Sequence, residues 1–110
     1  MNGHTIETIN THELKNLLDN EPHLCLIDVR EQEEWDIAHI PGAVHIPKGE
    51  LVAKIDAYMA DKNHPIYLHC KGGVRSAIAA QWLMEMGYQH VYSVDGGISD
   101  WMINGYPLAK

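Results

Sequence analysis

The residues with the clearest chemical potential surround one cysteine, Cys70, where a short apolar run over 66–69 meets a glycine-rich turn. Gly72 and Gly73 let the backbone curl so that successive N–H groups face the sulfur, and a helix predicted from Ser76 onward adds the positive end of its dipole. Surroundings of this kind lower the pKa of a thiol and hold an anion beside it. The turn therefore predicts nucleophilic chemistry of sulfur.

Two cations, Lys71 and Arg75, lie in the same turn of an acidic chain whose formal net charge is −7. Fixed positive charge stabilises a thiolate and attracts anionic substrates, and the alternative for both side chains is solvated loop charge. Ser76 can donate a hydrogen bond to the thiolate or merely begin the helix. With Cys70 as the catalytic nucleophile, the candidate substrate-binding residues of the turn are Lys71, Gly72, Gly73, Val74, Arg75 and Ser76.

The number of residues between Cys70 and Arg75 distinguishes between two kinds of cysteine-dependent enzyme. Cysteine-dependent phosphatases use the same strand, loop and helix, but their loop between cysteine and arginine is longer, which widens the ring of N–H groups to hold a tetrahedral oxyanion. Four residues separate Cys70 from Arg75 in this chain. The tighter ring suits one sulfur atom on Cys70 better than a phosphoryl group, and a phosphatase or arsenate reductase stays open as the alternative.

Short apolar runs alternate with helical patterns along the chain, which is typical of a parallel sheet covered on both faces. We predict an α/β fold, an open and mainly parallel sheet of about five strands with helices on both faces. The predicted strands are 5–9, 24–29, 43–46, 66–69 and 91–94, and the predicted helices are 11–20, 31–35, 49–60 and 76–87, with a last helical turn around Trp101. This order places Cys70 beyond the carboxyl end of a buried strand, where open α/β sheets bind ligands.

Local signals add detail to three of the helices. Asn10 and Glu13 have the spacing of a capping box at the start of the first helix. The apolar face of the 49–60 helix includes Tyr58, and that of the 76–87 helix includes Ile78. Both of these faces are expected to pack against the sheet.

The composition fits one globular domain over residues 1–110, because the chain is long enough for one core and 45% of it is hydrophobic. The two cysteines lack the number and spacing of a disulfide scaffold or a zinc site, and Cys25 fits a core strand. The eight histidines show no metal-binding spacing, so we expect neither a metal nor a cofactor. The acidic balance argues against a direct nucleic-acid partner, and without a membrane-spanning or signal segment we expect a soluble, cytoplasmic protein.

Three motifs together resemble the rhodanese family over nearly the whole chain. They are Asp28, Val29 and Arg30 continuing through Glu34 and Trp35 to 39–43 and 45–47, then the 70–75 turn, and then 96–101 followed by 105–107. Ala38 stands where many relatives have glycine, a change expected to alter a turn and not the chemistry. The resemblance implies a single rhodanese domain that moves a sulfane sulfur from thiosulfate or another persulfide donor to a thiophilic acceptor through a persulfide on Cys70.

The resemblance also bears on residues outside the turn and on partners. The family arginine at the position of Arg30 often helps to hold the donor anion, but an ion pair with a nearby carboxylate fits the sequence equally well: Asp28, Glu31 or Glu34. His69 precedes the nucleophile, and strand alternation favours a structural role over that of a base. The implied partners are small sulfur anions such as thiosulfate, thiols, and a protein sulfur donor or acceptor. A non-catalytic interaction module is the other alternative, although such rhodanese-like modules commonly lack the cysteine.

Overall fold

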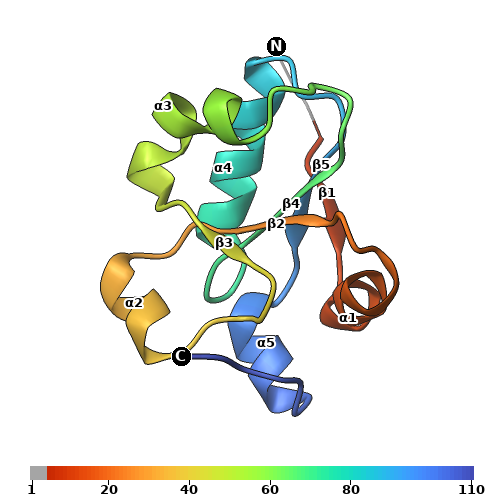
Figure 1. Ribbon diagram of the computed structural model, residues 1–110, viewed down its shortest axis with the longest axis vertical. Coiled ribbons are helices and arrows are strands. Elements are labelled where there is room, and N and C mark those ends of the chain that lie inside the picture. Colours follow the sequence, from red (N-terminus) through yellow and green to blue (C-terminus); the bar gives the residue numbers. More distant parts are fainter. Residues whose placement is uncertain (1–4) are drawn as a thin grey trace.

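The computed structural model describes residues 5–110, which form a five-stranded sheet with helices on both faces (Figure 1). The strands are β1 (Glu7–Ile9), β2 (Cys25–Asp28), β3 (Val44–His45), β4 (Ile66–His69) and β5 (Val91–Val94). Their spatial order is β1-β5-β4-β2-β3, and every pairing within the sheet is parallel. The predicted α/β class is therefore confirmed.

The helices divide between the two faces of the sheet. They are α1 (Thr11–Asn20), α2 (Gln32–Ile37), α3 (Lys48–Tyr58), α4 (Val74–Glu85) and α5 (Gly97–Ile103). α3 and α4 pack on one face, and α1 and α5 pack on the other (Figure 1). In β2, Cys25 and Ile27 join the α3 and α4 side of the core while Leu26 joins the opposite side. A strand buried on both faces reads as a continuous apolar run, which is why this one could be predicted.

The structure differs from the predicted elements mainly at their ends. α4 begins at Val74, earlier than the predicted start at Ser76. Gly73 has a φ of +122°, a conformation that glycine adopts readily and other residues do not, and it turns the chain directly into the helix. Arg75 and Ser76 therefore belong to the first turn of α4 and are fixed by it. β3 is shorter than predicted, and α2 continues to Ile37.

Two residues assigned to buried helix faces lie outside the core. Tyr58 is 43% exposed and Ile78 is 41% exposed, so these two predictions are wrong. In α4 the buried residues Ser76, Ala79, Ala80 and Leu83 lie on one side of the helix, and Ile78 lies on the other. Tyr58 has the helical spacing of the buried Leu51 and Ile55, but it is the last residue of α3. The small side chains of α4 leave room for close packing against the sheet that carries Cys70.

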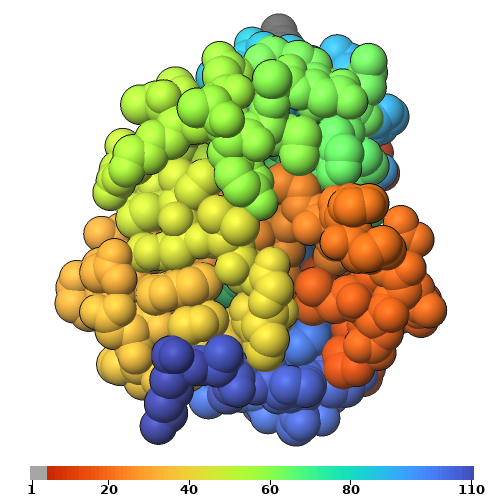
Figure 2. Space-filling view, in the orientation of Figure 1, coloured from red at the N-terminus to blue at the C-terminus, as the bar shows by residue number. Residues whose placement is uncertain are grey.

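Local hydrogen bonds fix both the first helix and the last residues of the chain. The Asn10 side chain accepts from the Glu13 amide at 2.8 Å, and the Glu13 carboxylate accepts from the Asn10 amide at 3.0 Å, so the predicted capping box is confirmed. At the other end, His39 and Ala109 exchange backbone hydrogen bonds of 2.9 and 2.8 Å. The C-terminal residues consequently lie against the segment between α2 and β3 (Figure 2).

Candidate active site

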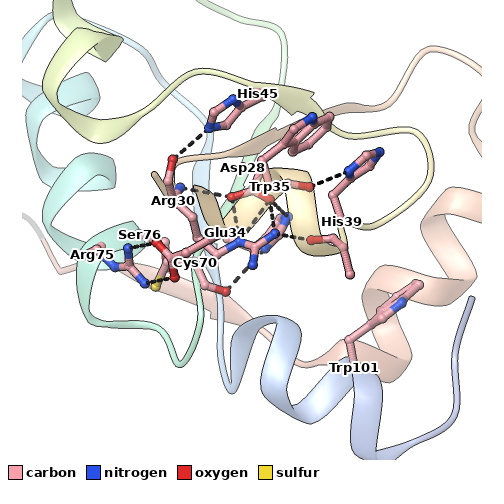
Figure 3. Close-up of polar contacts among 12 residues, drawn as sticks. Asp28, Arg30, Glu34, Trp35, His39, His45, Cys70, Arg75, Ser76 and Trp101 are labelled. Atoms are coloured by element: carbon pink, nitrogen blue, oxygen red, sulfur yellow. Dashed lines mark hydrogen bonds and ion pairs between the residues drawn. The ribbon is translucent and has the colours of Figure 1, made fainter. Parts of the chain in front are cut away.

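Cys70 lies directly after β4, at the carboxyl edge of the sheet, and only 1% of its surface is exposed. The Gly73 amide donates to the Cys70 sulfur at 3.1 Å, which closes the turn around the thiol. Figure 3 shows the sulfur beside the first turn of α4, with Ser76 next to it. The structure therefore places the predicted nucleophile at the start of a helix with a backbone N–H group aimed at its sulfur.

Two buried hydroxyl groups continue this arrangement behind the sulfur. The Ser76 Oγ lies 3.5 Å from the Cys70 Sγ and 2.7 Å from the Ser93 Oγ, and it can also donate to the Gly73 carbonyl at 3.1 Å. Ser76 has one hydroxyl proton, and Ser93 can donate to it. When Cys70 is a thiolate, donation from Ser93 leaves the Ser76 proton available to the sulfur. Ser93 in β5 is a site residue that the sequence did not indicate.

The pKa values of the two free cysteines are shifted in opposite directions although both thiols are buried. Burial raises the pKa of the Cys25 thiol to about 11. Burial also acts to raise the pKa of Cys70, but hydrogen bonds from the Ser76 side chain and from the Ser76, Gly73 and Gly72 amides outweigh it, and the pKa of Cys70 lies below its ordinary value. Of these two thiols, Cys70 is the better nucleophile near neutral pH.

The start of α5 holds the Cys70 turn from its other side. The Ile98 amide donates to the Cys70 carbonyl and the Ser99 amide to the Lys71 carbonyl, both at 3.0 Å. A β-carbon at Gly97 would lie 2.4 Å from the Cys70 carbonyl oxygen, and the φ of Gly97 is +53°. Only glycine fits this close approach, which gives a physical reason for the paired glycines before Trp101.

Arg75 points its guanidinium at a carboxylate from a distant part of the chain. Its Nη1 and Nη2 donate to the two carboxylate oxygens of Glu34 at 2.6 and 3.0 Å (Figure 3). Hydrogen bonding to Arg75 lowers the pKa of Glu34 to about 2, and the same bond raises the pKa of Arg75, to which the nearby Cys70 thiolate also contributes. The sequence predicted Arg75 as fixed positive charge in the turn. The structure shows instead that Glu34 balances that charge.

Arg30 forms the structural ion pair that the sequence left open. Its Nε and Nη2 donate to both carboxylate oxygens of the fully buried Asp28 at 2.9 to 3.1 Å, and Nη2 also donates to the Ala38 carbonyl at 2.7 Å. His69 lies beside this pair, with Nε2 3.5 Å from Asp28 and Nδ1 3.3 Å from the Cys70 carbonyl. Burial lowers the pKa of His69, which keeps the ring neutral near neutral pH. These contacts hold both side chains in place, and Arg30 also lines a surface hollow that borders Lys71.

The remaining residues of the turn face solvent. Lys71 and Val74 are exposed, and within residues 5–110 Lys71 forms no ion pair. A surface hollow of about 290 Å³ borders Lys71 and is also lined by Glu34, Ile37 and Met102. A second hollow, of about 470 Å³, borders the other side of the turn at Gly72, Gly73 and Val74. A substrate can thus approach the turn from two sides.

Residues 5–110 contain no group of three or more His, Cys, Asp or Glu side chains arranged to hold a metal ion. None of the helices in this part of the chain combines the length and the apolar character needed to span a membrane.

The fold and the turn define a class of protein: an α/β domain in which backbone amides and the start of a helix surround a cysteine after a central strand. The model of the rhodanese-like domain matches residues 10–104, and the chain belongs to this family. The solution structure of the rhodanese-like domain from an Anabaena protein matches with a TM-score of 0.85 at 28% identity, covering 96% of this chain and 80% of that one. The resemblance of the three sequence motifs is therefore confirmed.

Two curated relatives are similar to the chain over part of their own length. "Putative sulfur carrier protein YrkF" of Bacillus subtilis is 39% identical over 91% of this chain and 53% of that protein. "Probable adenylyltransferase/sulfurtransferase MoeZ" of Mycobacterium tuberculosis is 41% identical over 86% of this chain and 24% of that protein. The chain thus spans about half of the first relative and about a quarter of the second.

Proposed function

We propose that this protein is a sulfurtransferase that carries a sulfane sulfur as a persulfide on Cys70. It takes the sulfur from thiosulfate or another persulfide donor and passes it to a thiophilic acceptor. The observation that carries the proposal is the set of N–H and hydroxyl groups around the Cys70 sulfur, which lowers the pKa of a buried thiol. The names of the two relatives, one a sulfur carrier and the other a sulfurtransferase, support it.

Transfer takes place in two displacement steps at sulfur. In the first, the Cys70 thiolate attacks the outer sulfur of the donor, and the donor S–S bond breaks with its electron pair on the leaving group, which is sulfite from thiosulfate or a thiolate from an organic persulfide. In the second, the acceptor attacks the outer sulfur of the Cys70 persulfide. The product is thiocyanate from cyanide or a new persulfide from a thiol, and the Cys70 thiolate returns. Neither step needs an external oxidant.

The groups around the turn have distinct roles in these steps. The Gly73 amide and the Ser76 hydroxyl stabilise negative charge on Cys70 before loading and on the persulfide afterwards. Lys71 attracts the anionic donor from solvent. Val74, at the exposed start of α4, belongs to the rim that a larger donor or acceptor would contact.

A protein thiol is included among the proposed donors and acceptors. The hollow beside Lys71 exposes the apolar side chains of Ile37 and Met102, which a protein surface can cover.

Cys25 and Cys70 are both free thiols. Because a reducing compartment keeps thiols free, we place this chemistry in the cytoplasm.

Intact mass spectrometry after treatment with thiosulfate, and separately with cysteine persulfide, tests the proposal. We expect one added sulfur atom that cyanide removes, retained in Cys25→Ala and lost in Cys70→Ser. Sulfur on Cys25, or no adduct from either donor, would contradict the proposal and favour an interaction module. Hydrolysis of an aryl phosphate or reduction of arsenate, lost in Cys70→Ser, would instead establish the phosphatase or arsenate-reductase alternative.

A further inference from the structure

We propose that Glu34 determines which sulfur donors the site accepts, by cancelling the charge of Arg75 so that a persulfide on an uncharged carrier is preferred to the thiosulfate dianion. This inference rests on the proposed function and adds a donor class to it. It follows from the ion pairs around Cys70, the nature of the adjacent surface and the way in which α2 is held.

Both arginines near Cys70 are paired with carboxylates. Arg75 is paired with Glu34 through both carboxylate oxygens, and Arg30 is paired with the buried Asp28. Within residues 5–110, Lys71 is thus the one cation near the turn that no carboxylate neutralises. A thiosulfate dianion approaching a Cys70 thiolate therefore meets little net positive charge.

The surface beside this ion pair also offers little to a sulfonate group. The hollow that contains Glu34 and Lys71 is mainly apolar, with Ile37 73% exposed and Met102 52% exposed. Arg30 also lines it, but that side chain is buried and paired with Asp28. Sulfonate oxygens need hydrogen-bond donors or cations, since loss of hydration without replacement is costly. An organic persulfide needs no such groups for its carrier, and apolar side chains can contact its carbon atoms. The apolar surface of the hollow therefore favours an organic persulfide over thiosulfate.

Glu34 is held in place independently of any ligand. Its Oε1 also accepts from the Glu31 amide at 3.0 Å, as part of the capping of α2. The ring of Trp35, the next residue, stacks on His39 with centroids 3.6 Å apart and lies 5.0 Å from the ring of His45 (Figure 3). These contacts hold helix α2 in place, so that it presents the Glu34 carboxylate to Arg75 without a bound ligand.

Loading from the favoured donor balances without a further reactant. The Cys70 thiolate attacks the terminal sulfur of R–S–S–H, and a new S–S bond forms as the bond to R–S breaks. The electron pair leaves on R–S, which takes the proton of the former terminal S–H group. The products are the Cys70 persulfide anion and the thiol R–SH, so the net charge is the same before and after.

The test compares kcat/KM for thiosulfate with kcat/KM for ethyl persulfide, whose carrier has no charged group. The isosteric variant Glu34→Gln leaves the cation of Arg75 uncompensated, and we expect the ratio of thiosulfate to persulfide use to rise about tenfold, mainly through a lower KM for thiosulfate. Arg75→Gln leaves the Glu34 carboxylate uncompensated, and the ratio should fall by about the same factor. Glu33→Gln, on the exposed side of α2, is the matched control and should leave the ratio unchanged.

Opposite shifts distinguish charge from structure, because both variants break the same ion pair. Equal ratios in the parent and Glu34→Gln, or shifts in the same direction in the two variants, would overturn the inference and leave the pair a structural one. That result would leave the proposed function standing, since Cys70 would still load from both donors. Failure of the parent protein to load from either donor would overturn the function and, with it, the donor preference.

Discussion

Cys25 lies within β2, and Cys70 lies directly after the neighbouring strand β4. Both thiols are buried, and they differ in what surrounds the sulfur. Cys25 in β2 is packed among apolar residues, and burial raises the pKa of its thiol to about 11. Cys70 lies one residue beyond β4, and its sulfur accepts a hydrogen bond from the Gly73 amide and lies against the Ser76 hydroxyl. These contacts bring the pKa of Cys70 below its ordinary value. Burial alone makes a thiol inert, whereas burial together with aimed N–H and O–H groups makes a nucleophile.

The largest expected difference between the two thiols is in sulfur transfer itself. Cys70→Ala should reduce thiocyanate formation from thiosulfate and cyanide to background, because it removes the atom that carries the sulfur. Cys25→Ala removes a thiol whose pKa burial raises to about 11 and should keep most of the activity. Comparable losses in the two variants, measured at equal folded fractions, would mean that the distinction between the two environments is wrong.

Gly97→Ala should disrupt the Cys70 turn from the start of α5, which packs directly against it. The added β-carbon would meet the Cys70 carbonyl at 2.4 Å in a backbone conformation that alanine adopts poorly, so we expect a loss of at least about 2 kcal/mol of unfolding free energy. Denaturant unfolding measures this loss, and sulfur loading should fall as the turn shifts.

Gly49→Ala is the matched control for this glycine substitution. Gly49 lies in α3 with nothing within 4 Å of an added β-carbon, so alanine should be neutral or stabilising by up to about 1 kcal/mol. Equal unfolding free energies and equal sulfur loading in the Gly97 and Gly49 variants would show that the close approach of α5 to the Cys70 turn is not needed for stability or activity.

Ser76→Ala removes one hydrogen-bond donor from Cys70 without changing its burial. The pKa of Cys70 should rise, and sulfur loading at neutral pH should slow about tenfold, the effect of losing one hydrogen bond of about 1.5 kcal/mol to a charged group. Stopped-flow loading rates across pH measure both changes, because the rate follows the thiolate fraction and increases with pH up to the pKa. An unchanged pH profile would show that backbone amides alone activate the thiol.

Ser93→Ala should produce the smallest effect, since Ser93 acts on Cys70 only through Ser76. Without the Ser93 hydroxyl, Ser76 loses the donor at 2.7 Å that orients and polarises its own O–H group toward the sulfur, and loading should slow about twofold with a small rise in the pKa of Cys70. Faster loading in this variant would mean the reverse direction of hydrogen bonding, in which Ser93 takes the Ser76 proton away from the thiolate.

Features within one stretch of sequence could be predicted, and contacts between distant stretches could not. The parallel sheet, the capping box at Asn10 and the position of Cys70 after β4 depend on local patterns, and the structure contains all three. The pairing of Arg75 with Glu34 spans 41 residues, and the contact of Ser76 with Ser93 depends on the packing of α4 against β5. Spacing along the chain carries no signal for either contact.

The predictions for the two arginines show the same limit. A carboxylate partner for Arg30 was among the alternatives because Asp28 is two residues away. Glu34 was considered as a partner of Arg30 and not of Arg75, since the turn of α2 toward α4 is a property of the folded sheet. The acidic residues of α2 were the available clue, because an isolated basic turn in an acidic chain needs a nearby carboxylate if its arginine is to be partly buried.

Titration of the two thiols in one molecule tests the central claim most directly. Protein labelled with ¹³C at the cysteine β-carbons gives one NMR signal for each thiol, and each signal shifts as its thiol ionises. We predict a midpoint for Cys70 below the ordinary cysteine value of 9.0 and a midpoint for Cys25 near 11. A Cys70 midpoint at or above 9.0 would contradict the account, because the amides and hydroxyl around its sulfur would then fail to overcome burial.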